Sequence, residues 1–330
     1  LALITGNKMG NDARWNSEKL EANRNFMNKL YNAAKFILMN TDDYVPCTYE
    51  DVKDRLTLAD RWIISKMNRL ALEIDANMEK YEFGIAAEKL YDFSWNTFCD
   101  WYIELSKTAL YNKADESQKQ GAQYTLLYVF SEIMKLLHPF IPFVTEELFL
   151  ALNKNETTIM TQLWTEGEAQ KIDEGCEGDM DMIVEAVRAI RNARSNMNIV
   201  PSKKSDVYLQ AEDKQVFDLI TRCENYFAAL CSVKSILPQA TETDNCISAV
   251  FGRGSFAIPL DDLIDKEKEQ SRLEKEKERL TAEVALTEKK LNNPGFVNKA
   301  PAEVVASERE KQKKYSAMLA EVEDKLSKLG

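Results

Sequence analysis

Two runs of heptad spacing near the C-terminus constrain the fold of this chain most strongly. The seam positions of the first run are Gln270, Leu273, Lys277, Leu280, Val284, Thr287 and Leu291. Those of the second run are Val305, Glu308, Gln312, Tyr315, Leu319, Val322, Leu326 and Leu329. Residues 292–301 between them contain two prolines and a glycine, which a continuous helix does not tolerate. Two seams of matched length joined by a turn predict an antiparallel coiled-coil hairpin over residues 262–330.

The chain from residue 18 to residue 198 shows the periodicity of helices. Apolar residues recur at intervals of three and four, the spacing that lines one face of an α-helix. The predicted helices cover 18–40, a stretch from Thr57, about 86–108, about 117–137, a stretch from Thr145, and Met180 to about Met197. Ser17, Thr57 and Thr145 are the predicted N-caps, and Gly84 is expected to separate the second helix from the third. Together these helices predict an antiparallel bundle.

The segment 199–261 has the shorter alternation that is typical of strands. Strands are predicted over 206–211, 233–237, 247–251 and 255–260, with a helix over 213–231. The predicted fold class is therefore mainly α, with an antiparallel helix bundle, a small α+β module and a C-terminal antiparallel coiled-coil hairpin.

The composition excludes several classes of site. The 330 residues include one histidine, His138, and six cysteines without a CxxC pair, so we expect no metal site and no disulfide framework. His138 stands at a predicted helix end, where a structural role is favoured over a catalytic one. The formal net charge of -11 argues against indiscriminate binding of nucleic acid, so any RNA contact must depend on local patches. No apolar run is long enough to span a membrane, and no signal peptide is visible.

The first predicted helix carries a polar stripe that includes one aromatic ring. On a helical wheel Asn25, Lys29, Asn32 and Phe36 lie opposite the apolar face, and Lys35 flanks the ring. Amides, ammonium groups and an exposed ring suit unstacked RNA bases, which proteins read by stacking and by hydrogen bonds to base edges. The alternative is that another helix covers Phe36 and that the amides are simply solvated.

Cationic side chains concentrate near the end of the predicted bundle. Arg188, Arg191 and Arg194 recur every third residue, and Lys203 and Lys204 follow soon after. These side chains could bind phosphates, or they could pair with acidic side chains on the surfaces of neighbouring helices.

Several segments of the chain resemble the valyl-tRNA synthetase family. Asn-Asp-Ala-Arg at 11–14 and the longer segment 23–36 are similar to the region that follows the catalytic domain in that family. Segments 98–104 and 190–204 also resemble it closely. The most specific match is Asn-Pro-Gly-Phe-Val-Asn-Lys-Ala-Pro at 293–301, because isoleucyl and leucyl enzymes do not usually end in such an arm. The resemblance covers essentially the whole chain.

The resemblance implies a division of labour along the chain. Residues 1–17 would be a remnant that links to a missing catalytic domain, and 18–198 would be the helical anticodon-binding domain. Residues 199–261 would form the small α+β module, and 262–330 would form an arm along the outer corner of tRNA. The start without a methionine also indicates a fragment.

The resemblance also implies particular contacts with tRNA. Phe36 matches an aromatic residue at the anticodon surface of the family. Lys290, Phe296 and Lys299 are the residues expected to meet tRNA from the arm.

The family joins valine to tRNA and uses ATP and magnesium, but its two nucleotide-binding motifs, HIGH and KMSKS, are absent here, as is its editing domain. The resemblance therefore implies a cytoplasmic monomer that binds tRNA, specifically a valine-accepting tRNA, holds no cofactor and contains no catalytic residue. Two alternatives stay open, the equivalent region of an isoleucyl-tRNA synthetase and a coiled-coil scaffold protein.

Overall fold

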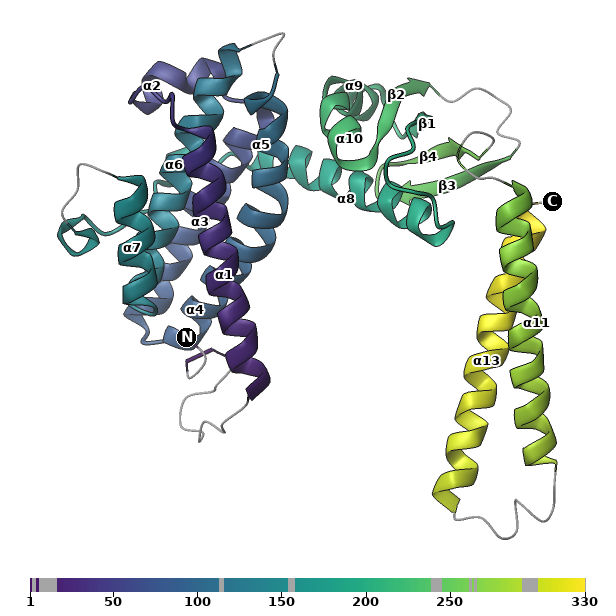
Figure 1. Ribbon diagram of the computed structural model, residues 1–330. Helices are drawn as coiled ribbons and strands as arrows, with labels where there is room; N and C mark the ends of the chain where they lie inside the picture. Colours follow the sequence, from purple (N-terminus) through teal and green to yellow (C-terminus); the bar gives the residue numbers. More distant parts are fainter. Residues whose placement is uncertain are drawn as a thin grey trace. The chain divides into compact units, whose positions relative to one another are not determined.

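The computed structural model describes residues 1, 4–5, 17–112, 116–153, 158–238, 245–260, 263, 266–292 and 302–329. They form two compact units, one within residues 1–185 and the other within residues 186–330 (Figure 1). The first unit is a helix bundle, and the second contains a small mixed sheet and a helical hairpin. The predicted fold class is confirmed.

The bundle is built from helices that follow the predicted order. Its elements are α1 (Ser17–Asn40), α2 (Tyr49–Val52), η1 (Lys53–Arg55), α3 (Leu58–Glu79), α4 (Phe83–Asp92), η2 (Phe93–Tyr102), α5 (Ile103–Leu110), α6 (Ser117–Leu137), α7 (Pro142–Leu152), η3 (Ile159–Thr161), η4 (Ala169–Lys171) and the first half of α8 (Glu174–Asn196). Helix α1 contacts η2, α6 and α7, so three elements cover its apolar face.

The start of α3 is fixed by a capping box, as predicted for Thr57. Thr57 Oγ1 accepts from the Asp60 backbone N–H at 3.2 Å, and the Asp60 carboxylate accepts from the Thr57 backbone N–H at 2.8 Å. Asp60 is fully buried, and the hydroxyl of Tyr102 donates to its other oxygen at 2.7 Å. Burial raises the pKa of Asp60, while its hydrogen bonds to Thr57 and Tyr102 oppose that shift. The cap therefore also joins α3 to η2 through a buried hydrogen bond.

The predicted helix over about 86–108 needs correction in two respects. It begins at Phe83, so Gly84 lies inside α4 and not between helices. Its centre is a ten-residue π-helix, η2, in which the N–H of Ile103 bonds the carbonyl of Phe98 five residues earlier. Side-chain periodicity does not distinguish π from α winding over such a short stretch. Four aromatic rings of η2 are buried in the bundle: Phe93, Phe98, Trp101 and Tyr102.

Thr145 does not cap a helix, contrary to the prediction. Helix α7 begins three residues earlier, with Pro142 in its first turn, where the missing N–H costs nothing. Thr145 is buried, and its hydroxyl donates to the carbonyl of Ile141 at 3.0 Å. His138 Nδ1 lies 2.8 Å from the same hydroxyl, so the single histidine ties the end of α6 to α7.

The second unit contains a four-stranded sheet in the order β2-β1-β4-β3. Its elements are β1 (Ser205–Ala211), α9 (Lys214–Arg222), α10 (Glu224–Cys231), β2 (Val233–Pro238), β3 (Cys246–Phe251) and β4 (Gly254–Pro259). Strands β1 and β2 are parallel and are joined through α9 and α10, whereas the other pairs are antiparallel. The helix predicted over 213–231 is two helices, separated at Cys223.

The C-terminal hairpin pairs α11 (Lys266–Leu291) with α13 (Ala302–Leu329) (Figure 1). The buried seam positions are Leu280, Thr287, Val305, Glu308 and Val322. Seven further seam positions are half-buried: Lys277, Val284, Leu291, Gln312, Tyr315, Leu319 and Leu326. Lys277 in the first half of α11 pairs with Glu323 near the end of α13, at 2.9 Å. Lys290 at the end of α11 pairs with Glu308 near the start of α13, at 3.4 Å. The two helices are therefore antiparallel. The side chains of Gln270, Leu273 and Leu329 lie outside the described residues.

Replacing Tyr102 by Phe should destabilise the bundle. The substitution keeps the ring but leaves a buried oxygen of Asp60 without its donor, which costs about 1–3 kcal/mol. Urea unfolding of the full chain at neutral pH measures the loss. Tyr81→Phe is the matched control, because Tyr81 is 69% exposed. Equal stability of Y102F and Y81F would contradict the assigned role.

The coiled-coil hairpin should lose stability as the pH falls. Hydrogen bonds from Lys311 and Lys290 hold the pKa of Glu308 below its ordinary value. A carboxylate whose pKa is lower in the folded state stabilises that state above its unfolded pKa, and the contribution disappears as acid protonates it. Thermal melts of the wild-type chain and of Glu308→Gln should therefore differ at about pH 7 and converge toward about pH 3. A difference that does not change with pH would show that Glu308 acts only through packing.

Candidate nucleic-acid interface

Helix α1 separates a buried face from a polar stripe. Phe26, Leu30, Ala33, Ala34 and Ile37 are buried among the neighbouring helices. The apolar face is narrower than the wheel predicts, because Met27 is half-buried and Leu38 is 36% exposed. Three predicted site residues, Asn25, Asn32 and Lys35, are exposed. They can therefore meet a ligand without any rearrangement of the bundle.

Lys29 belongs to the stripe but is already engaged within the bundle. Its ammonium lies 2.5 Å from Asp100 Oδ1 and 3.9 Å from the centre of the Trp95 ring, both on η2. Trp95 stacks on Tyr91 at 5.8 Å, and Phe26 lies 4.5 Å from Tyr91. Lys29 is thus held in one place at the edge of an aromatic cluster. Sequence reasoning missed Asp100 and Trp95, since nothing in the linear pattern places η2 beside α1.

The exposure of Phe36 is intermediate between the two alternatives, a fully exposed ring and a ring that another helix covers. Its side chain is half-buried, and the ammonium of Lys107 on α5 lies 5.5 Å from the ring centre. A neighbouring helix thus touches the ring without enclosing it. The remaining exposed part adjoins Asn32 and Lys35 on the same helix.

The cationic residues around the end of α8 differ sharply in exposure. Four of them, Arg188, Arg191, Lys203 and Lys204, are exposed. Arg194 is 5% exposed and donates to Ser205 Oγ at 3.2 Å and to the carbonyl of Lys203. Arg191 Nε donates to the carbonyl of Leu230 at 2.8 Å.

Lys203 Nζ donates to the carbonyl of Leu263 at 3.2 Å. The structure therefore does not present the predicted cations as one uniform surface.

A pocket of about 770 Å³ lies in the second unit beside these arginines. Arg191 and Arg194 form its cationic wall, and Val200, Pro201 and Leu230 contribute apolar lining. This pocket brings together two of the five predicted phosphate contacts.

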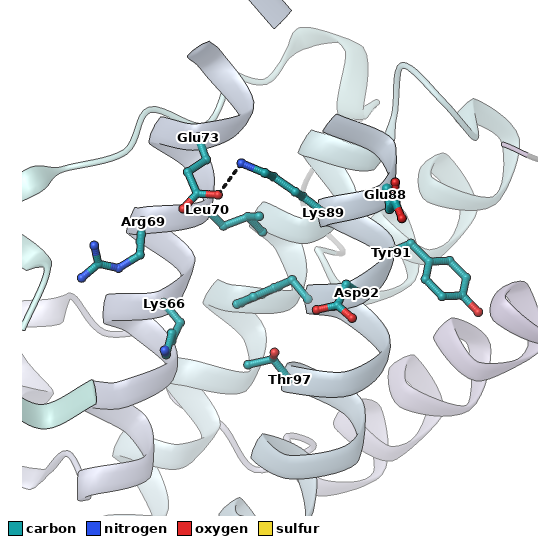
Figure 2. Close-up of a pocket in the computed structure, with 10 residues that line it drawn as sticks. Lys66, Arg69, Leu70, Glu73, Glu88, Lys89, Tyr91, Asp92 and Thr97 are labelled. Carbon is teal, nitrogen blue, oxygen red and sulfur yellow. Dashed lines mark hydrogen bonds and ion pairs between the residues drawn. The ribbon is translucent and has the colours of Figure 1, made fainter. Parts of the chain in front are cut away.

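A different groove lies in the first unit, between α3 and the segment formed by α4 and η2 (Figure 2). Its volume is about 560 Å³. Lys89 pairs with Glu73 at 2.6 Å, and both Arg69 and Lys66 pair with Glu177, at 3.1 Å and 3.5 Å. Because each of these cations has a carboxylate partner, we do not assign this groove to phosphate.

The predicted contacts on the arm are only partly visible. Lys290 is exposed at the end of α11 and lies 3.4 Å from Glu308. Phe296 and Lys299 lie outside the described residues. Among the residues that the structure does describe, no cluster of His, Cys, Asp and Glu could hold a metal ion. Within the same residues, no helix has the length and apolar character needed to cross a membrane.

Comparison with known proteins gives two family matches. Residues 60–209 match the anticodon-binding domain of tRNA ligases, and residues 265–330 match the valyl tRNA synthetase tRNA binding arm. The second match covers α11 and α13, and it includes residues 293–301, which carry the most specific resemblance in the sequence.

Individual relatives extend over nearly the whole chain. Valine–tRNA ligases of Clostridium acetobutylicum, Clostridium perfringens and Bacillus subtilis are 44%, 42% and 36% identical, each over 99% of this chain. The chain spans 37% of the length of each of these relatives. These matches support the valine-specific family over the isoleucyl and scaffold alternatives. The chain therefore belongs to the valine–tRNA ligase family, and it corresponds to the C-terminal part of those enzymes.

Proposed function

We propose that this chain is the tRNA-recognition part of a valine–tRNA ligase, and that it binds the anticodon and the outer corner of a valine-accepting tRNA. The observation that carries the proposal is the exposed stripe on α1 in the same chain as a tRNA-binding arm. In the complete enzyme ATP, L-valine and tRNA would give valyl-tRNA, AMP and diphosphate. ATP and magnesium would be used by the catalytic domain, outside this chain.

The α1 stripe has the chemistry that single-stranded RNA requires. Anticodon bases are unpaired, so their faces can stack on a ring and their edges can bond to amides and ammonium groups. Phe36 supplies the ring, Asn25 and Asn32 supply amides that both donate and accept, and Lys35 supplies an exposed cation. Lys29 would act from a fixed position, because Asp100 and Trp95 hold its ammonium.

The remaining parts of the chain would position the tRNA. We assign anticodon reading to residues 18–198, a connecting role to 199–261 and contact with the tRNA corner to the arm, 262–330. Residues 1–17 would join the catalytic domain. Arg188 and Lys204, which are exposed, would contact phosphates. Lys290, Phe296 and Lys299 would be the residues of the arm that contact tRNA. A monomer in the cytoplasm is the state that we propose.

Phe36→Ala should weaken tRNA binding with only a modest effect on folding. Stacking of a base on an aromatic ring is worth ~1–3 kcal/mol, so the affinity should fall roughly 5- to 150-fold. Because the ring is half-buried, the loss of stability should stay below the ~3–5 kcal/mol of a buried Phe→Ala change. Titration with purified valine tRNA and thermal unfolding of the same variant measure both quantities.

Tyr31→Ala is the matched control for Phe36→Ala. Tyr31 is a 62% exposed aromatic residue on the same helix, and it lines a different pocket, together with Phe143 and Glu147 of α7. Its removal should leave tRNA affinity unchanged. A large fall in the melting temperature of F36A without a specific loss of affinity would assign Phe36 to the core.

Removal of the arm, residues 262–330, should weaken binding to different tRNAs by similar factors. The described charges of the arm alternate in sign, and contacts with phosphates carry no base information. Affinities for valine-accepting and isoleucine-accepting tRNAs, measured with and without the arm, test this expectation. Loss of affinity for the valine tRNA alone would make the arm a reader of sequence.

A further inference from the structure

Arg194 is a buried cation without an anionic partner among the described residues. Its side chain is 5% exposed, and its contacts are two neutral acceptors, the Ser205 hydroxyl and the Lys203 carbonyl. The nearby Cys231 thiol cannot supply the missing charge, because burial raises its pKa to about 12 and it stays protonated at neutral pH. A buried charge that lacks a counter-charge is costly to fold around. The burial of Arg194 therefore calls for an explanation, such as a bound anion.

Arg194 is one of the residues that line the 770 Å³ pocket. Arg191 lines it as well, and both arginines are anchored by hydrogen bonds to carbonyl groups, Arg194 to that of Lys203 and Arg191 to that of Leu230. Anchored guanidinium groups lose little side-chain entropy on binding and match the geometry of phosphate oxygens. The cationic wall is therefore preorganised for an anion.

The rest of the lining suits a larger group than a bare anion. Ile199, Val200, Pro201 and Leu230 present apolar surface, and Ser195 and Asn198 add polar groups at the same pocket. The volume lies within the range of small-molecule sites, about 300–1,000 Å³, and exceeds what a phosphate ion alone needs. Apolar and cationic side chains that line one pocket match the two ends of a nucleotide.

We propose that this pocket binds one unpaired nucleotide of the RNA ligand, with its phosphate on Arg194 and Arg191 and its base against Val200, Pro201 and Leu230. The proposal rests on the proposed function, since the nucleotide belongs to the bound tRNA. It adds a second place of nucleotide recognition, in a different unit from the α1 stripe. It also gives Arg194 its counter-charge, which would form only in the complex.

Affinity for purified valine tRNA across a salt series tests the proposal in the full chain. Arg191→Gln should lower the affinity about tenfold and reduce the slope of log affinity against log salt by about one. Val200→Trp should lower the affinity as well, because Val200 is 55% exposed and a larger side chain would fill the pocket without changing any charge. Arg222→Gln is the control, an exposed arginine at the end of α9 that does not line the pocket, and it should change neither quantity.

Small probes separate a nucleotide site from a bare anion site. Cytidine 5′-monophosphate should raise the melting temperature of the wild-type chain more than inorganic phosphate or cytidine does, since only a bound ligand stabilises the folded state. The shift should disappear in V200W. Equal shifts with phosphate and with the nucleotide, or an undiminished shift in V200W, would overturn the proposal.

The experiment distinguishes failure of this pocket from failure of the proposed function. If R191Q and V200W bind tRNA like the wild type while F36A binds weakly, the pocket proposal is wrong and the anticodon assignment stands. If the wild-type chain does not bind tRNA at all, the proposed function fails first. Because V200W keeps both arginines and their anchoring bonds, its melting temperature shows whether any loss of affinity comes from unfolding.

Discussion

The packing of α1 against the end of α4 and the π-helical segment η2 separates the buried side of α1 from its polar stripe. The Phe26 ring on α1 packs against the rings of Tyr91 and Trp95. Lys29 lies at the edge of the same cluster and pairs with Asp100. A π-helix is usually a single turn inside an α-helix, so the ten residues of η2 are exceptional. The contact decides which residues of α1 are buried and which remain for a ligand.

A second constraint is the distribution of charge in an acidic chain. Many cations of the bundle pair with nearby carboxylates, as in Lys89–Glu73 and Lys29–Asp100. Such paired cations add little to the electrostatic attraction between the protein surface and RNA. Exposed cations remain at Lys35, Arg188 and Lys204, and two arginines, Arg191 and Arg194, line the pocket. A chain with net charge -11 can bind RNA in this way and still reject non-specific polyanion contacts.

Much of the fold follows from local sequence signals. The capping box at Thr57 starts α3 where the pattern predicts, and α6 occupies Ser117–Leu137 as its apolar stripe indicates. Every described seam position of the hairpin is at least half-buried, because heptad spacing leaves a coiled coil little choice of register. The errors fall where two local signals compete, as at Thr145, where a proline three residues earlier begins the helix.

The features of the candidate site also fall into two groups, those that follow from local sequence and those that depend on tertiary packing. The polar stripe of α1 and the cations near the end of α8 can both be predicted from the sequence, because each follows from the spacing of residues along one helix. The contacts of Lys29 with Asp100 and of Phe36 with Lys107, and the burial of Arg194 at a pocket, cannot be predicted in this way. Such outcomes depend on which segments distant in the chain pack together, and the burial of a charge is a property of that packing and not of its own helix.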